Sequence, residues 1–275
     1  MKNSMSPEVL EQEQKVSKAF SKQSLVFDEA DSQNEILQWM RWRVRKHVMN
    51  IWKPGNMVLE LNAGTGIDAV FFAENGFYVH AIDNAPGMIT ALDKKIKQKH
   101  LERKISSQLC SFLELEKLKG EKFDHIFSNF GGLNCTDKLQ NVINSFHTLL
   151  KPGGTITLII MPPVCPWELL YLFRGNFKLA FRRLKKGGAP SYLEGVNFTT
   201  WYYSPSAVKN MFGNNYSLLS ITGLGITIPP PFLKDFPGKH YKLFRKLITI
   251  ENSVATKAPF RSWADHFIIS AKKLV

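Results

Sequence analysis

The spacing of apolar residues changes near residue 56 and divides the chain into two parts. Before this point, residues 8–20 and 34–50 carry apolar side chains at helical spacing, so we expect two helices there. After it, short apolar runs alternate with helical stretches. The runs predict strands over residues 57–61, 78–83, 105–110, 124–129 and 155–161, and the stretches between them predict helices over 66–75, 86–99 and 136–150.

The alternation of strand and helix predicts the fold class. Strands joined by helices form a parallel sheet that is covered on both faces. A helix over residues 204–213 and strands over 216–227 and 266–273 complete the pattern. We therefore expect an α/β fold, with a Rossmann-like, doubly wound and mostly parallel seven-stranded sheet.

Two segments interrupt the later half of this pattern. Residues 162–203 are rich in aromatic residues, Pro and Gly, and residues 229–265 open with PPPFL. Neither continues the alternation of strand and helix. We expect a helical extension or cap over residues 1–55 and an α/β domain over 56–275, with substrate-cap insertions at 162–203 and 229–265.

Cysteine usage and hydropathy bear on where the protein works. Its three cysteines lie far apart and lack C-x-x-C spacing, which argues against a zinc site or a disulfide framework. The polar N-terminus lacks the apolar core of a signal peptide. The longest apolar stretch, TITLIIMPPV, is too short to span a bilayer as a helix. We therefore expect a cytoplasmic protein without a metal site.

The net charge of +13 gathers in basic clusters at residues 41–46, 93–104, 181–186 and 240–246. A surface of this kind attracts polyanions, either nucleic acid or anionic lipid. A solvated, self-repelling surface accounts for it equally well. Charge alone does not rank these three alternatives.

The stretch VLELNAGTG, residues 58–66, indicates a strand that runs into a glycine turn. In a dinucleotide-binding turn the first glycine follows the strand at once, but Asn62 occupies that position, although a shifted match begins at Gly64. A carboxylate at Glu60, near the end of a buried strand, would oppose a pyrophosphate. A ligand that carries an ammonium group and a sulfonium would instead offset the buried negative charge of Glu60.

Four segments taken together resemble the class I S-adenosylmethionine-dependent methyltransferases across roughly residues 56–161. ELNAGTG resembles their first motif, and VHAIDNAPGM resembles the segment of the second strand. FDHIFSNFGGLN resembles the fourth-strand motif, and LLKPGG the turn before the fifth strand. SNFGGLN is not of the N-P-P-Y type, so the chain looks more like the small-molecule branch, which includes quinone-biosynthesis methyltransferases.

The resemblance implies S-adenosyl-L-methionine as cofactor and assigns its binding residues. Asp83 would bind the ribose hydroxyls, Met88 would flank the adenine, and Asn129 would lie beside the reacting methyl group. Gly64 and Gly66 would let the backbone approach the ligand. The full candidate set is Glu60, Asn62, Ala63, Gly64, Thr65, Gly66, Asp83, Asn84, Met88, Ser111, Phe112 and Asn129.

Two positions depart from the family's pattern. Asn62 replaces the usual first glycine, although Asn tolerates unusual backbone angles better than most residues. Cys110 and Ser111 stand where the family often has an acidic residue that contacts the adenine amino group. Adenine recognition would then rest on the backbone and on Phe112.

In this family the acceptor is usually recognised by the N-terminal extension and by insertions after the fifth strand and before the last one, and this chain is elaborated in all three places. Together with the resemblance to the small-molecule branch, this predicts a small, lipophilic or aromatic acceptor. Residues 167–186 have the pattern of an amphipathic helix with one apolar and one basic face. Such a helix could rest on an anionic membrane and admit a lipophilic substrate. It could also be a lid packed on its own domain, which is the commoner arrangement.

Three residues are candidates for catalysis. His266 follows Asp265 at the start of the last strand and could act as a base with an orienting carboxylate, or be a structural histidine. Tyr202 and Tyr203 in TTWYYSP could line the acceptor site or anchor the core. The favoured function is small-molecule methyl transfer. The alternatives are RNA methylation, motivated by the basic clusters, a non-catalytic S-adenosylmethionine-binding subunit and, last, a nicotinamide oxidoreductase.

Overall fold

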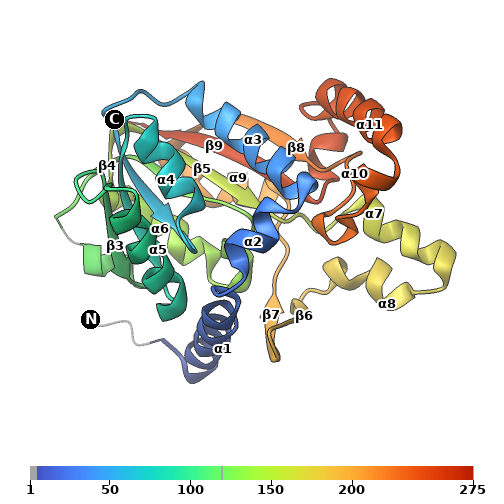
Figure 1. The fold of residues 1–275 in the computed structure, drawn as a ribbon, viewed down its shortest axis with the longest axis horizontal. Coiled ribbons are helices and arrows are strands. Elements are labelled where there is room, and N and C mark those ends of the chain that lie inside the picture. Colours follow the sequence, from blue (N-terminus) through green and yellow to red (C-terminus); the bar gives the residue numbers. More distant parts are fainter. Residues whose placement is uncertain (1–4, 119, 275) are drawn as a thin grey trace.

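A computed structural model describes residues 5–118 and 120–274 of the chain. Its centre is a seven-stranded sheet with the strand order β3-β2-β1-β4-β5-β9-β8 (Figure 1). β1 to β5 pair in parallel, and β9 runs antiparallel to both β5 and β8. The strands are β1 (Met57–Leu61), β2 (Tyr78–Asp83), β3 (Ile105–Leu109), β4 (Phe123–Ser128), β5 (Leu150–Ile160), β8 (Tyr216–Leu224) and β9 (His266–Lys273).

Helices cover both faces of this sheet, which confirms the predicted doubly wound α/β fold. One apolar core packs α6 and α9 against the sheet, and the other packs α3, α4, α5 and α11 against the opposite face. The helices are α1 (Pro7–Gln23), α2 (Phe27–Ser32), α3 (Glu35–Met49), α4 (Ile67–Glu74), α5 (Pro86–Gln98), α6 (Leu139–Leu149) and α9 (Pro205–Met211). Short 3-10 turns are η1 (Leu115–Leu118), η2 (Gly132–Cys135) and η5 (Gly213–Asn215).

The first insertion differs from its prediction, because residues 167–186 do not form one amphipathic helix. The segment divides into α7 (Pro166–Leu169), η3 (Leu170–Arg174), α8 (Phe177–Ala180) and η4 (Arg182–Leu184). Gly175 causes the first break, since it adopts a left-handed conformation with φ 69°. Asn176 then caps α8 by accepting a hydrogen bond from the Leu179 N–H at 3.1 Å.

Two further elements lie in segments that the sequence pattern left irregular. A hairpin pairs β6 (Ala189–Leu193) with β7 (Val196–Thr200) through Glu194 at φ 49° and Gly195 at φ 77°, the geometry of a tight primed turn. The second insertion contains η6 (Pro231–Leu233), α10 (Phe236–Lys239), α11 (Tyr241–Val254) and η7 (Phe260–Ser262). Fully buried Glu251 on α11 accepts hydrogen bonds from three successive backbone N–H groups, at residues 225–227.

The first two helices, α1 and α2, lie at the edge of the sheet where the parallel strands end (Figure 1). On α1, the Gln12 side chain exchanges two hydrogen bonds with the Thr199 backbone in the hairpin, at 2.8 and 3.1 Å. The Ser17 hydroxyl donates to the carbonyl of Asn84, directly after β2, at 2.8 Å. The extension therefore bridges the hairpin and the end of the second strand. Among the described residues, no helix is long and apolar enough to cross a membrane.

Candidate active site

The glycine turn after β1 has the backbone that the sequence predicts. Gly64 and Gly66 have φ of 57° and 78°, and a Cβ on Gly66 would lie 2.2 Å from Cδ1 of Leu92. Asn62 also has a positive φ, 44°. Its side chain accepts from the Ser128 hydroxyl at 2.6 Å and donates to the Asn129 carbonyl at 3.1 Å. These two bonds hold the turn where the family usually has a glycine.

Asp83, at the end of β2, joins this turn to the neighbouring strand. Its two carboxylate oxygens accept backbone hydrogen bonds from Gly64 and from Ala85, each at 2.9 Å. Burial raises the pKa of Asp83 to about 6, although these two hydrogen bonds oppose the shift. The carboxylate thus sits beside the glycine turn, as the sequence predicts.

Glu60 is buried at the end of β1, and its Oε2 has no hydrogen-bond partner among the described residues. Burial raises the pKa of Glu60 well above its usual value and Asp68 adds to the shift, whereas Arg41 opposes it. An unpartnered buried carboxylate oxygen needs a donor, preferably a cation. The ammonium group of an amino-acid ligand meets this need.

Asp68, in the first turn of α4, is hydrogen-bonded to several polar side chains near the ends of the parallel strands. It accepts hydrogen bonds from Arg41, from Arg45 Nε at 2.8 Å and from Asn129 Nδ2 at 2.8 Å. Burial would raise the pKa of Asp68, but the two arginines outweigh it and lower that pKa. The side-chain NH₂ group of Asn129 therefore donates to Asp68, and its side-chain oxygen Oδ1 accepts a hydrogen bond from the Phe130 N–H.

The remaining predicted cofactor residues lie around the same strand ends. The Ala63 N–H donates to the Ile82 carbonyl at 2.9 Å, and the Thr65 hydroxyl donates to Asp28 on α2. Met88 and Phe112 are buried. The side chains of Asn84 and Ser111 both turn toward the N-terminal helix, where they hydrogen-bond to Glu13. All twelve predicted residues therefore come from the ends of β1 to β4 and from the turns and helix starts that follow them.

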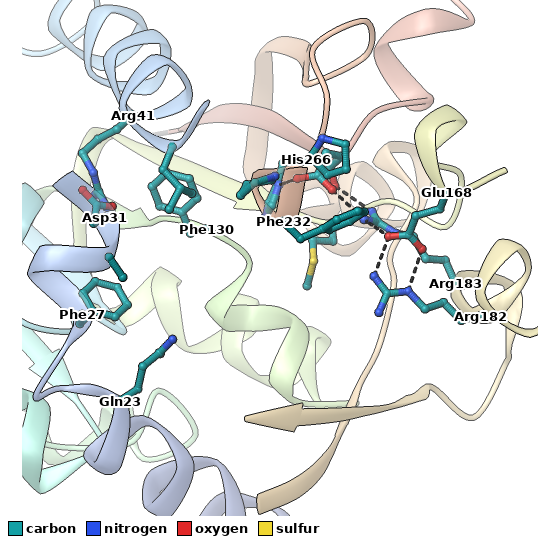
Figure 2. Close-up of a pocket in the computed structure, with 16 residues that line it drawn as sticks. Gln23, Phe27, Asp31, Arg41, Phe130, Glu168, Arg182, Arg183, Phe232 and His266 are labelled. Carbon is teal, nitrogen blue, oxygen red and sulfur yellow. Dashed lines mark hydrogen bonds and ion pairs between the residues drawn. The ribbon is translucent and has the colours of Figure 1, made fainter. Parts of the chain in front are cut away.

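A cavity of about 340 Å³ adjoins this region and is enclosed by the N-terminal extension, the end of β4 and both insertions (Figure 2). Phe27, Phe130 and Phe232 supply aromatic walls. A Cβ built on Gly64 would lie 3.9 Å from the ring of Phe27, so this wall lies close to the glycine turn. Apolar surface dominates the lining and meets the charged side chains at two sides.

His266 is the predicted catalytic candidate that lines this cavity. Its Nδ1 lies 2.9 Å from Oδ2 of Asp265, and its ring meets Phe130 edge-on with centroids 6.1 Å apart. Burial alone would raise the pKa of Asp265, but His266 and Arg183 outweigh it and hold that pKa well below its usual value. The ionised Asp265 carboxylate accepts a hydrogen bond from Nδ1–H, which leaves Nε2 as the basic nitrogen.

A buried ionic network carries this pair into the first insertion. Arg183 donates to Asp265 Oδ1 and to Glu168 Oε1, both at 2.7 Å (Figure 2). Arg182 holds Glu168 in a bidentate pair at 2.6 and 2.7 Å. The network fixes α7 and η4 to the start of β9. His266 is thus held at the cavity wall by Asp265, which Arg183 holds in turn.

The two tyrosine candidates lie elsewhere. The Tyr203 hydroxyl donates to the carbonyl of Thr136, and the side chain packs against the apolar core. The ring of Tyr202 lies under the Arg183 guanidinium, 5.2 Å from its centroid. Neither residue lines the 340 Å³ cavity.

Sequence reasoning missed several residues that shape this site. Arg41 was grouped with a surface cluster, yet it is buried, pairs with Asp31 and Asp68, and lies 4.6 Å from the Phe130 ring centroid. Its place three residues before buried Val44, on the apolar face of α3, was the available signal. Phe27 carried no comparable signal, because α2 lacks a clear amphipathic pattern.

This fold and glycine turn define a Rossmann-like enzyme that binds a nucleotide-containing cofactor at the carboxyl ends of its strands. Residues 58–154 match the family model described as a methyltransferase domain. The chain resembles class I S-adenosylmethionine-dependent methyltransferases, among them the quinone-biosynthesis enzymes, and this similarity indicates a methyltransferase with S-adenosylmethionine as its cofactor.

Individual relatives give the scale of the similarity. The chain is 26% identical to the demethylmenaquinone methyltransferase of Listeria welshimeri over 187 residues, which is 66% of this chain and 77% of that protein. The structure of 1,6-didemethyltoxoflavin-N1-methyltransferase from Burkholderia thailandensis superimposes with a TM-score of 0.57. It is 14% identical, and the match covers 100% of this chain and 94% of that one. A methyltransferase from Methanosarcina mazei gives 0.56 at 14% identity, covering 83% and 97%.

Proposed function

We propose that the protein methylates a small, neutral, lipophilic or aromatic acceptor of the quinol type, bound in the 340 Å³ cavity. The composition of the cavity carries this proposal. Its aromatic walls suit a ring, and its three arginines are balanced by three carboxylates. The charged members are Arg41, Arg182 and Arg183, and Asp31, Glu168 and Asp265. The similarity to demethylmenaquinone methyltransferases supports an acceptor of this class.

The cofactor would be held at the ends of the parallel strands. S-adenosylmethionine supplies a methyl group activated by a sulfonium. In this proposal Glu60 accepts from its ammonium group, Asp83 accepts from its ribose hydroxyls, and Met88 with Phe112 flanks its adenine. The glycine turn lets the backbone approach the ligand. Asn129 contributes by fixing Asp68, while its side-chain amide stays bound to the protein.

His266 would act as the general base. An aromatic hydroxyl becomes a stronger electron donor when its proton leaves, and Nε2 of His266 is the free acceptor at the cavity wall. Asp265 then stabilises the positive charge on the imidazole. The proton therefore passes from the acceptor hydroxyl to Nε2, and the Asp265 carboxylate stays ionised.

The first test is ligand binding followed by an acceptor screen. S-adenosylhomocysteine at about one hundred times its dissociation constant should stabilise the protein by roughly 2.7 kcal/mol and raise its melting temperature. NAD, at the same concentration, should not. A short-chain demethylmenaquinol should then accept a methyl group from S-adenosylmethionine. Stabilisation by NAD alone, or transfer only to RNA in a matched assay, would contradict the proposal.

We further propose that the two insertions touch an anionic membrane through an insertion surface, defined by Phe173, Phe177, Phe181, Tyr241 and Leu243. All five are exposed, and Phe173 and Phe177 have exposures of 88% and 63%. Phe173 lies in η3, Phe177 begins α8 and Phe181 follows it, whereas Tyr241 and Leu243 lie on α11. α8 and α11 lie at one end of the molecule (Figure 1). Basic side chains accompany them, namely Arg174, Lys178, Lys185, Lys242 and Lys246.

This surface adjoins the proposed acceptor cavity. Phe232 lines the cavity and is also 53% exposed. Its ring lies 6.4 Å from that of Tyr171 in the first insertion. A lipophilic acceptor could therefore pass from an apolar phase into the cavity without crossing bulk water, which supports a bilayer as the partner.

Vesicle co-sedimentation tests the membrane contact. The wild-type protein should bind phosphatidylglycerol vesicles more tightly than phosphatidylcholine vesicles, and 0.5 M salt should weaken the binding by screening. The double variant Phe173→Ser/Phe177→Ser should lose about tenfold or more in partitioning, because two buried aromatic side chains are removed. Tyr192→Ser, an exposed aromatic residue on the hairpin, is the matched control. Equal binding by the double variant would refute the contact.

A further inference from the structure

The N-terminal helix places a carboxylate against the ends of β2 and β3. Glu13 on α1 is only 7% exposed. Its Oε2 accepts a hydrogen bond from Asn84 Nδ2 at 3.2 Å and another from the Ser111 hydroxyl. Asn84 directly follows β2, and Ser111 follows β3 by one residue. Glu13 therefore joins the two strand ends between which the nucleoside of the cofactor is expected.

The other oxygen of Glu13 is unused. Oε1 is buried and has no hydrogen-bond partner among the described residues. Gln12, the next side chain with an amide donor, is already committed, because its Nε2 donates to the carbonyls of Cys135 and Thr199 at 3.1 and 2.8 Å. Burial raises the pKa of Glu13, while Ser111 and Asn84 oppose that shift. A buried acceptor with no donor loses free energy that a ligand N–H can restore.

The two residues directly after β3 supply no anionic acceptor. Burial raises the pKa of the Cys110 thiol to about 11, so it stays neutral. The Ser111 hydroxyl donates its proton to Glu13. Asp83 lies on the ribose side and already receives two backbone N–H groups. Within this group, Glu13 Oε1 is the remaining anionic acceptor for a nucleobase amine.

We propose that Glu13 Oε1 accepts a hydrogen bond from the exocyclic amino group of the cofactor's adenine. This inference rests on the proposed cofactor site. It makes α1 part of that site, so that a helix outside the methyltransferase domain selects the nucleobase.

The experiment compares S-adenosylhomocysteine with S-inosylhomocysteine, in which a carbonyl replaces the amino group. Calorimetry of the full chain should show that wild type prefers the adenine ligand on the order of tenfold to a hundredfold. Glu13→Gln can turn an amide N–H toward the carbonyl, so it should bind the adenine ligand more weakly and the inosine ligand more tightly. Glu11→Gln, exposed on the same helix and paired with Lys15, should change neither constant.

The outcomes separate this inference from the proposed function. Equal weakening of both ligands in Glu13→Gln would mean that Glu13 only holds the helix in place, and would overturn the inference. If wild type bound neither ligand, the proposed cofactor site itself would fall. Should Glu13→Gln unfold, Glu13→Asp replaces it: a retracted carboxylate should weaken the adenine ligand more than the inosine ligand, whereas a purely structural role weakens both alike.

Discussion

Replacing His266 with alanine should lower kcat by about 10²- to 10⁴-fold, the usual contribution of a positioned general base. The structure provides the reason. Asp265 holds Nδ1 at 2.9 Å, and Arg183 keeps the carboxylate ionised in a buried setting, so Nε2 is the basic atom at the cavity wall. The loss should appear in kcat with the quinol acceptor, because the imidazole matters when the hydroxyl proton moves.

Two readouts distinguish this role from a structural one. The dissociation constant of S-adenosylhomocysteine should stay within about twofold, and added imidazole should restore part of the rate by filling the vacated space. His240→Ala, an exposed histidine at the end of α10, should behave like wild type. Full activity of His266→Ala would exclude the histidine as base.

The second large effect concerns Asp83→Asn, which should weaken S-adenosylhomocysteine binding by about 1–3 kcal/mol at pH 7.5. Asn offers a single acceptor atom, yet the native carboxylate serves Gly64, Ala85 and, in our proposal, two ribose hydroxyls. The exposed Asp137→Asn is the matched control, because Asp137 forms a surface ion pair with Lys138. An unchanged dissociation constant in calorimetry would remove Asp83 from the cofactor site.

Asp83 also predicts how cofactor binding depends on pH. The ionised carboxylate is the acceptor and its pKa is about 6, so affinity should fall about tenfold per pH unit below that value. The stability of the protein without cofactor depends on pH in the opposite direction. The raised pKa means that the folded state holds this proton more tightly, so the contribution of Asp83 to stability declines from about pH 4 to about pH 6. Asp83→Asn should abolish both trends.

The sequence predicts the parallel half of the fold closely, for a physical reason. β1 and β2 are largely apolar runs that end at a glycine turn and at an acidic residue, and they form at the predicted residues 57–61 and 78–83. Apolar runs of this length are stable only where both faces are buried, which is the position of a central strand. The predicted helix 66–75 differs by one residue at each end from Ile67–Glu74, and the predicted helix 86–99 differs from Pro86–Gln98 by one residue at its C-terminal end.

Beyond Met161 the local signals compete, and the prediction is weaker. The apolar spacing of residues 167–186 favours one helix, but Gly175 prefers a left-handed backbone and the helix breaks there. The β6–β7 hairpin depends on Glu194 and Gly195, where a non-glycine residue takes a positive φ. The Glu13–Ser111 contact spans 98 residues of chain, and no local pattern in either segment indicates it.

The position of the N-terminal extension has a consequence for the order of ligand exchange. Phe27 lies close to the glycine turn, and Ser17 and Glu13 hydrogen-bond to residues at the ends of β2 and β3, so the extension spans the proposed nucleoside site. Phe232, which lines the acceptor cavity and is partly exposed, lies instead on the second insertion. In the proposed arrangement the two ligands therefore enter and leave by different routes. The acceptor can dissociate while the nucleoside remains bound beneath the first two helices.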